Sequence, residues 1–195
     1  MQDSLFTAQP AESNETPEEV NDELLRRARS LPQFRDRVFI FGEGPLRAKA
    51  AVVGESPGPP DIESGRPFMG PAGQMLERIL GSIGLARADC YLTNTVKIIF
   101  QGDEITPAWL SFFTPYLHRE LAAVRPRLII SFGNTPTRAL LRTKKPISQL
   151  RGEFQDYEGT PLMPTFNPAY LLRDPTKKRE VWEDMKKIRS FLAST

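Results

Sequence analysis

Four short apolar segments, separated by helix-forming sequence, constrain the fold of this 195-residue chain more than any other feature. These segments lie at 49–54, 90–94, 127–132 and 161–166. None of them alternates regularly between apolar and polar residues, which is typical of strands that are buried on both faces. The pattern predicts an α/β fold with a single three-layer α/β/α domain and a central, mostly parallel four-stranded sheet.

Helix-forming segments surround the expected strands. They span 17–29, 71–83, 106–124, 135–141 and 177–193. The first has clear start signals, because Thr16 can cap a helix and Pro17 suits its first position. Residues 1–16 are polar and carry no periodic apolar pattern, so we expect a disordered acidic arm there and the folded domain at 17–195.

The net charge of +2 hides an uneven distribution along the chain. Residues 1–24 contain seven of the 24 acidic residues and none of the 26 basic ones, which leaves a basic body. Such a body suits a polyanionic partner such as nucleic acid, but an ordinary solvated surface is compatible with the same balance. No segment approaches the roughly 18 consecutive apolar residues of a membrane span, so we expect a cytoplasmic monomer without membrane contact.

The chain has one cysteine and one histidine. Cys90 alone excludes an intrachain disulfide and any zinc or iron–sulfur site that needs several thiolates, so we expect no metal and no cofactor. His118 falls in the middle of an expected helix, which favours a packing or surface role.

Polar or glycine residues follow all four expected strands. Glu55 follows the first strand, Asn94 ends the second, Gly133 and Asn134 follow the third, and Asn167 follows the fourth. A parallel sheet binds ligands beyond the carboxyl ends of its strands, so these residues are expected to converge at one edge.

The loop after the first strand adds an acidic residue, Asp61, and an aromatic one, Phe68, just before a helix. Carboxylates, a stacking ring and a helix N-terminus together suit chemistry on a flat heterocycle. Each also has a simple structural alternative, since a loop acid is ordinarily solvated and a Phe ordinarily lies in a core.

Several motifs, in the right order, resemble those of the uracil-DNA glycosylase superfamily. They read Val-Gly-Glu-Ser-Pro-Gly at 53–58, Arg-Pro-Phe-Met-Gly-Pro-Ala-Gly-Gln-Met-Leu at 66–76 and Thr-Phe-Asn-Pro-Ala-Tyr-Leu-Leu-Arg at 165–173. The resemblance is to the family-four branch and covers about residues 38–193. It implies a DNA base-excision repair enzyme that hydrolyses the N-glycosidic bond of uracil, or of a related deaminated base, with water as nucleophile.

The resemblance implies a base pocket formed by Gly54, Phe68 and Asn94. Phe68 would stack on the extruded base, which contributes roughly 1–3 kcal/mol. One amide both donates and accepts, so Asn94 suits the N3–H and O4 of a uracil edge. Their structural alternatives are a core Phe and an Asn that caps a strand end.

The resemblance also implies that Glu55, Asp61 and Asn167 are catalytic. The two carboxylates would stabilise the oxocarbenium-like sugar and orient water. Asn167 stands where the family usually has His, and it can donate only a neutral hydrogen bond to the base, about half as strong as a charged one. We therefore expect slower or differently targeted excision.

Residues after the last expected strand are predicted to contact DNA. One of Leu171 and Leu172, at most, would fill the hole left by a flipped nucleotide, because leucines that open a helix also suit a core. Arg173, Lys177 and Lys178 would contact phosphates.

The family's four iron–sulfur cysteines correspond approximately to Arg27, Ser30, Ile98 and Phe113. None of these supplies a thiolate, and Ile98 and Phe113 are expected to fill the vacated space with apolar packing.

The N-terminal arm contains a peptide, Gln2 to Phe6, that resembles the motif by which bacterial repair proteins dock onto the sliding clamp. Gln2 would fill a polar pocket and Leu5 and Phe6 an apolar one, although a chance match is the alternative.

A differently targeted or non-catalytic DNA-binding protein is the alternative function. A nucleotide hydrolase is less favoured, because the basic body suits a polymer.

Overall fold

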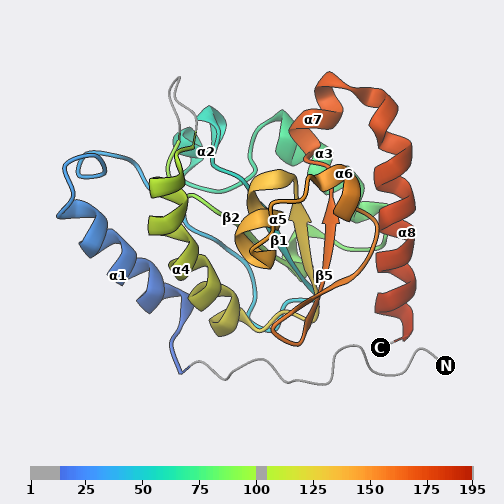
Figure 1. Ribbon diagram of the computed structural model, residues 1–195, viewed down its shortest axis with the longest axis horizontal. Coiled ribbons are helices and arrows are strands. Elements are labelled where there is room, and N and C mark those ends of the chain that lie inside the picture. Colours follow the sequence, from blue (N-terminus) through green and yellow to red (C-terminus); the bar gives the residue numbers. More distant parts are fainter. Residues whose placement is uncertain (1–13, 100–104, 195) are drawn as a thin grey trace.

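The centre of the molecule is a sheet (Figure 1), seen in a computed structural model that describes residues 14–99 and 105–194. Within these residues five strands pair in the order β2-β1-β3-β5-β4. The strands are β1 (Ala50–Gly54), β2 (Cys90–Asn94), β3 (Ile129–Phe132), β4 (Gln155–Tyr157) and β5 (Thr160–Thr165). All neighbouring pairs are parallel except β4 with β5, so the mostly parallel sheet is confirmed.

The sheet has one strand more than predicted, because β4 was missed. β4 has three residues and pairs with β5 through a two-residue turn at Glu158 and Gly159. Both turn residues have positive φ, at 50° and 85°, which matches the twist of a tight hairpin. Two of the strand's residues are Gln155 and Asp156, so it offers no apolar run that a sequence pattern could detect.

The five predicted helices are present, the first with the predicted boundaries and the others within two residues of them. They are α1 (Pro17–Arg29), α3 (Pro71–Gly81), α4 (Pro107–Val124), α5 (Asn134–Leu141) and α8 (Lys178–Ser194). Thr16 caps α1 as expected, in a reciprocal capping box with Glu19. Additional short elements are α2 (Pro59–Ser64), α6 (Ile147–Leu150), α7 (Pro168–Arg173) and the 3₁₀ turns η1 (Arg87–Asp89) and η2 (Pro175–Lys177).

Apolar side chains bury both faces of the sheet. Alternate strand residues such as Val52 and Ile130 pack with α3 and α8, whereas Val53 and Ile129 pack with α4 and α5. Figure 1 shows α8 and α4 on opposite sides of the strands. The three-layer α/β/α architecture is therefore confirmed, and it explains why the strand sequences do not alternate.

A third cluster, which contains several aromatic rings, joins α1, α4 and the chain after β2. Ile98 and Phe113 are both fully buried in it. The Arg27 guanidinium lies over the Phe112 ring at 5.9 Å, and the Ser30 hydroxyl donates to the Arg27 carbonyl. These residues do not fit an iron–sulfur cluster, because two of the four positions are core hydrocarbon and none provides sulfur.

The lone cysteine and histidine both have packing environments. Cys90 is buried, which raises the pKa of its thiol to about 12. A hydrogen bond of 2.5 Å joins His118 Nδ1 to the hydroxyl of Tyr157, and burial lowers the pKa of the imidazole.

Of the predicted acidic arm, residues 14–16 are described, and Glu15 pairs there with Arg119 of α4. Among the described helices none is long and apolar enough to cross a membrane.

Candidate active site

The carboxyl ends of the parallel strands bring most of the predicted site residues to one edge. Gly54 at the end of β1 lies directly opposite Asn94 at the end of β2. On the other side of β1, Phe132 ends β3 opposite Thr165 of β5, just before Asn167. Glu55 directly follows β1, which lies between β2 and β3 in the sheet.

Gly54, Phe68 and Asn94 meet at a single point. A Cβ added to Gly54 would lie 2.4 Å from Oδ1 of Asn94 and 2.7 Å from Cζ of Phe68. Real Cβ atoms do not approach other atoms so closely, so the absence of a side chain at Gly54 is what allows the amide and the ring to converge. Asn94 is 2% exposed and Phe68 is half-buried, so both are held by the surrounding protein.

Glu55 is the exposed carboxylate of this edge. Its Oε2 accepts a hydrogen bond of 2.5 Å from the hydroxyl of Thr135, near the start of α5. Its main-chain carbonyl accepts from the Val96 N–H, two residues beyond Asn94. These contacts fix the Glu55 backbone to the end of β2 and its carboxylate to the end of β3, beside the base pocket.

Asp61 lies on α2 and serves its own loop. It is 5% exposed, and its two oxygens accept main-chain hydrogen bonds from Gly58 at 3.0 Å and Met69 at 2.7 Å. These two hydrogen bonds close the 58–69 loop, and the predicted role of Asp61 as a second catalytic carboxylate stays a prediction.

Asn167 caps α7. Its Oδ1 accepts from the Ala169 N–H at 2.8 Å, and its Nδ2 lies 3.4 Å from the Phe132 carbonyl. A Cβ on Gly133 would lie 3.3 Å from the Cβ of Asn167, which places this side chain against the end of β3. The amide oxygen caps the helix and one N–H of the NH₂ group donates to Phe132, so the second N–H is the donor that a ligand could use.

Two buried ionic contacts support these strand ends and were missed by sequence reasoning. Lys97, which is 1% exposed, donates to the Asn94 carbonyl at 2.8 Å and to Glu120 at 2.6 Å. Asp184 of α8 accepts from the Thr165 hydroxyl at 2.6 Å and pairs with Arg151, while burial raises the pKa of its carboxyl. Lysine and aspartate are almost never fully buried, so sequence offers no signal for such contacts.

The structure separates the two leucines of α7. Leu171 is 1% exposed and lies in the core, whereas Leu172 is 44% exposed. Arg173 and Lys178 are exposed, and Lys177 pairs with Glu180 at 2.7 Å, which raises the pKa of its ammonium group. Gln2, Leu5 and Phe6 lie outside the described residues, so the docking motif stays a prediction.

Comparison with known proteins gives a family match and several relatives. Residues 41–186 match the family model described as the uracil DNA glycosylase superfamily. A type-4 uracil-DNA glycosylase from Thermotoga maritima is 32% identical over 180 residues, which cover 89% of this chain and 94% of the relative. Relatives of the same name from Saccharolobus solfataricus and Pyrobaculum aerophilum are 33% and 31% identical, each over 84% of this chain and over 80% and 88% of their own lengths.

Proposed function

Because this chain belongs to the uracil-DNA glycosylase superfamily, we propose that it is a DNA repair glycosylase that hydrolyses the N-glycosidic bond of uracil in DNA. The observation that carries the proposal is the convergence of the Asn94 amide and the Phe68 ring on Gly54, next to the Glu55 carboxylate. An amide, an aromatic face and an acid are the groups needed to read a base, to hold it and to act at its sugar.

Base recognition would use the edge and the face of an extruded uracil. Asn94 can accept from uracil N3–H through Oδ1 and donate to O4 through Nδ2, a combination that cytosine does not match. Phe68 would cover the face of the ring. Asn94 is buried and its main-chain carbonyl accepts from Lys97, so the backbone that carries the reading amide is held in place before DNA binds.

Bond cleavage would use Glu55 and Asn167. As the C1′–N1 bond breaks, its electron pair leaves with the base as an anion, which solvent then protonates. A water oriented by Glu55 adds to C1′ and passes a proton to the Glu55 carboxylate. The Asn167 NH₂ group would donate a neutral hydrogen bond to the negative charge that develops on the base O2. Asp61 would act indirectly, by holding the loop that carries Phe68.

DNA contact would centre on α7 and the start of α8. Leu172 is the exposed leucine and the one we propose as the wedge, with Arg173, Lys177 and Lys178 nearby for phosphates. Clamp docking, a monomeric state and a cytoplasmic location stay predictions.

Replacing Leu172 by Ala is expected to slow excision from double-stranded DNA roughly tenfold or more, because an apolar side chain no longer fills the gap in the duplex. Excision from single-stranded DNA, which has no such gap, should change little. The measurement is single-turnover cleavage of matched single- and double-stranded substrates. Leu171→Ala is the matched control: as a core truncation it should lower stability by about 2–5 kcal/mol without separating the two substrates. Equal effects of Leu172→Ala on both substrates would contradict the wedge.

The proposed function is tested by base release from short DNAs that carry uracil in a single strand, opposite G or opposite A, with hypoxanthine and xanthine DNAs alongside. Release of uracil is the expected result. Release of another base alone would keep the mechanism and change the substrate. Binding without any release would favour the alternative, a recognition protein that retains the pocket.

A further inference from the structure

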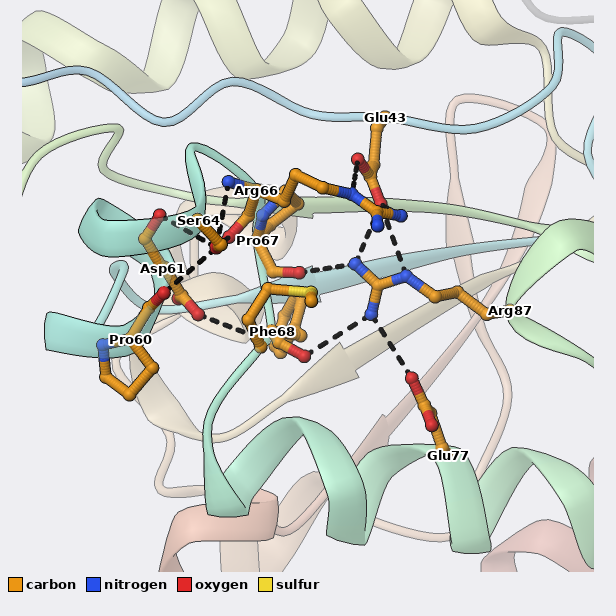
Figure 2. A network of polar contacts seen from close by, with 10 residues as sticks. Glu43, Pro60, Asp61, Ser64, Arg66, Pro67, Phe68, Glu77 and Arg87 are labelled. Atoms are coloured by element: carbon orange, nitrogen blue, oxygen red, sulfur yellow. Dashed lines mark hydrogen bonds and ion pairs between the residues drawn. The ribbon is translucent and has the colours of Figure 1, made fainter.

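Arg87 extends from η1, just before β2, to the loop that carries Phe68 (Figure 2). Its guanidinium donates to two successive main-chain carbonyls, those of Pro67 at 2.5 Å and Phe68 at 3.3 Å. The same group donates to Glu43 at 2.7 Å and lies 3.5 Å from a carboxylate oxygen of Glu77. The side chain is 19% exposed and is therefore surrounded by protein partners.

The Phe68 backbone adopts a conformation that needs such support. Its φ is 59°, in the left-handed region that residues with a side chain seldom occupy unless their surroundings enforce it. The Phe68 carbonyl also presses against α3, where a Cβ on Gly73 would come within 1.8 Å of the carbonyl oxygen. Arg87 and Gly73 together determine where this peptide lies, and through it the direction of the ring.

Glu43 orients the Arg87 guanidinium. Its backbone is tied to β2 by two hydrogen bonds with Leu92, of 2.8 and 3.0 Å, so it is a firm anchor. Its carboxylate accepts a two-pronged contact from Arg66, at 2.9 Å to each oxygen, and a further contact from Arg87. These cations hold the pKa of Glu43 below its usual value, with the Arg66 hydrogen bond as the largest cause.

We propose that Arg87 is a positioning residue that holds the Phe68 ring in its base-stacking orientation. The loop is then held by hydrogen bonds on two sides. Its Pro67 and Phe68 carbonyls accept from Arg87, and its Met69 N–H donates to Asp61. The inference rests on the proposed function, since it gives Arg87 a role only if Phe68 stacks on the base. Arg87 itself does not touch the base.

The test is a double-mutant cycle of Arg87→Met and Phe68→Ala, measured by single-turnover uracil release at saturating DNA. Arg87→Met alone is expected to slow release by about 10- to 100-fold, because misplacement of a binding group by an ångström has effects of that size. Its Kd for DNA without uracil should stay within about twofold of wild type, because the guanidinium serves the loop and does not contact the DNA backbone. When Phe68 is already Ala, adding Arg87→Met should slow release by a further factor of less than about three, because the ring that Arg87 positions is gone.

Two further variants keep the test informative. Lys49→Met removes another basic side chain, paired at 2.8 Å with Asp89 of the same 3₁₀ turn, and should leave the release rate unchanged. Arg87→Lys keeps a cation beside Glu43 but cannot donate to Glu43 and both carbonyls in one fork, so its rate should lie between those of wild type and Arg87→Met. If Arg87→Met fails to fold, Arg87→Lys takes its place in the cycle.

The outcomes separate the inference from the function on which it rests. If the double variant loses release rate by the full product of the two single losses, the positioning role is overturned and stacking is left intact. A wild-type rate for Arg87→Met would do the same. A wild-type rate for Phe68→Ala would remove stacking from the proposed function, and the positioning role with it.

Discussion

Replacing Glu55 by Gln is expected to slow uracil release by about 10²- to 10⁴-fold, the usual contribution of a positioned acid or base. Gln keeps the size of the side chain and an oxygen that can accept from Thr135, so the loop geometry should survive. What is lost is the negative charge, which stabilises the cationic sugar and orients the attacking water. Single-turnover release from a uracil-containing single strand measures the effect without a contribution from base flipping.

Glu63→Gln is the matched control for Glu55→Gln. Glu63 is an exposed carboxylate on α2, the helix that follows the same strand, and its loss should leave the rate within about twofold of wild type, as for most surface substitutions. Unchanged unfolding temperatures should accompany both variants. If Glu55→Gln released uracil at the wild-type rate, Glu55 would have no part in the chemistry, and the site would need another acid.

Replacing Phe113 by Ala is expected to lower the free energy of unfolding by about 3–5 kcal/mol, as for other large core aromatics. Phe113 is a fully buried residue of α4 in the cluster shared with α1, and its ring makes edge contacts with Phe34 and Phe112 at centroid distances of 5.4 and 5.1 Å. This cluster fills the space between α1 and α4, which are joined on the surface by the ion pair of Arg119 with Glu23, so apolar packing supplies the buried part of their contact. The free energy of unfolding is measured by urea unfolding. The dependence of this free energy on urea concentration is compared between wild type and variant.

Phe112→Ala provides the comparison within the same helix. Its ring is only half-buried beside Arg27, so a clearly smaller loss is expected. An iron chelator should leave the unfolding midpoint of the wild-type protein unchanged. A loss of less than about 1 kcal/mol in Phe113→Ala would show that this region is not a packed core.

Sequence reasoning worked best where function depends on strand ends. The apolar runs located β1, β2, β3 and β5, and parallel pairing brings the ends of such strands to one edge whatever the details of packing. Gly54, Glu55, Asn94 and Asn167 could therefore be placed together before any coordinates were known. Phe68 was placed by its family resemblance, and the structure brings its ring to Gly54.

Sequence reasoning could not resolve a side chain's role where that role depends on which atoms surround it. Asp61 has the spacing of a second catalytic acid, and only the structure shows that it also accepts from two main-chain N–H groups of its own loop. Leu171 and Leu172 are identical in type and adjacent, but the helix turns one into the core and the other outward. Arg87 gave no signal at all, because its hydrogen-bond partners Glu43, Pro67 and Phe68 lie far from it in sequence.

The sequence by itself determined the fold class, the edge at which the site lies and the chemical groups available there. Hydrophobic burial and strand direction act through patterns along the chain, so they can be read without coordinates. Only the tertiary structure decided which of those groups face a ligand and which hold the others in place. Hydrogen bonds need donor and acceptor within about 3 Å, and that proximity is set by how distant segments pack.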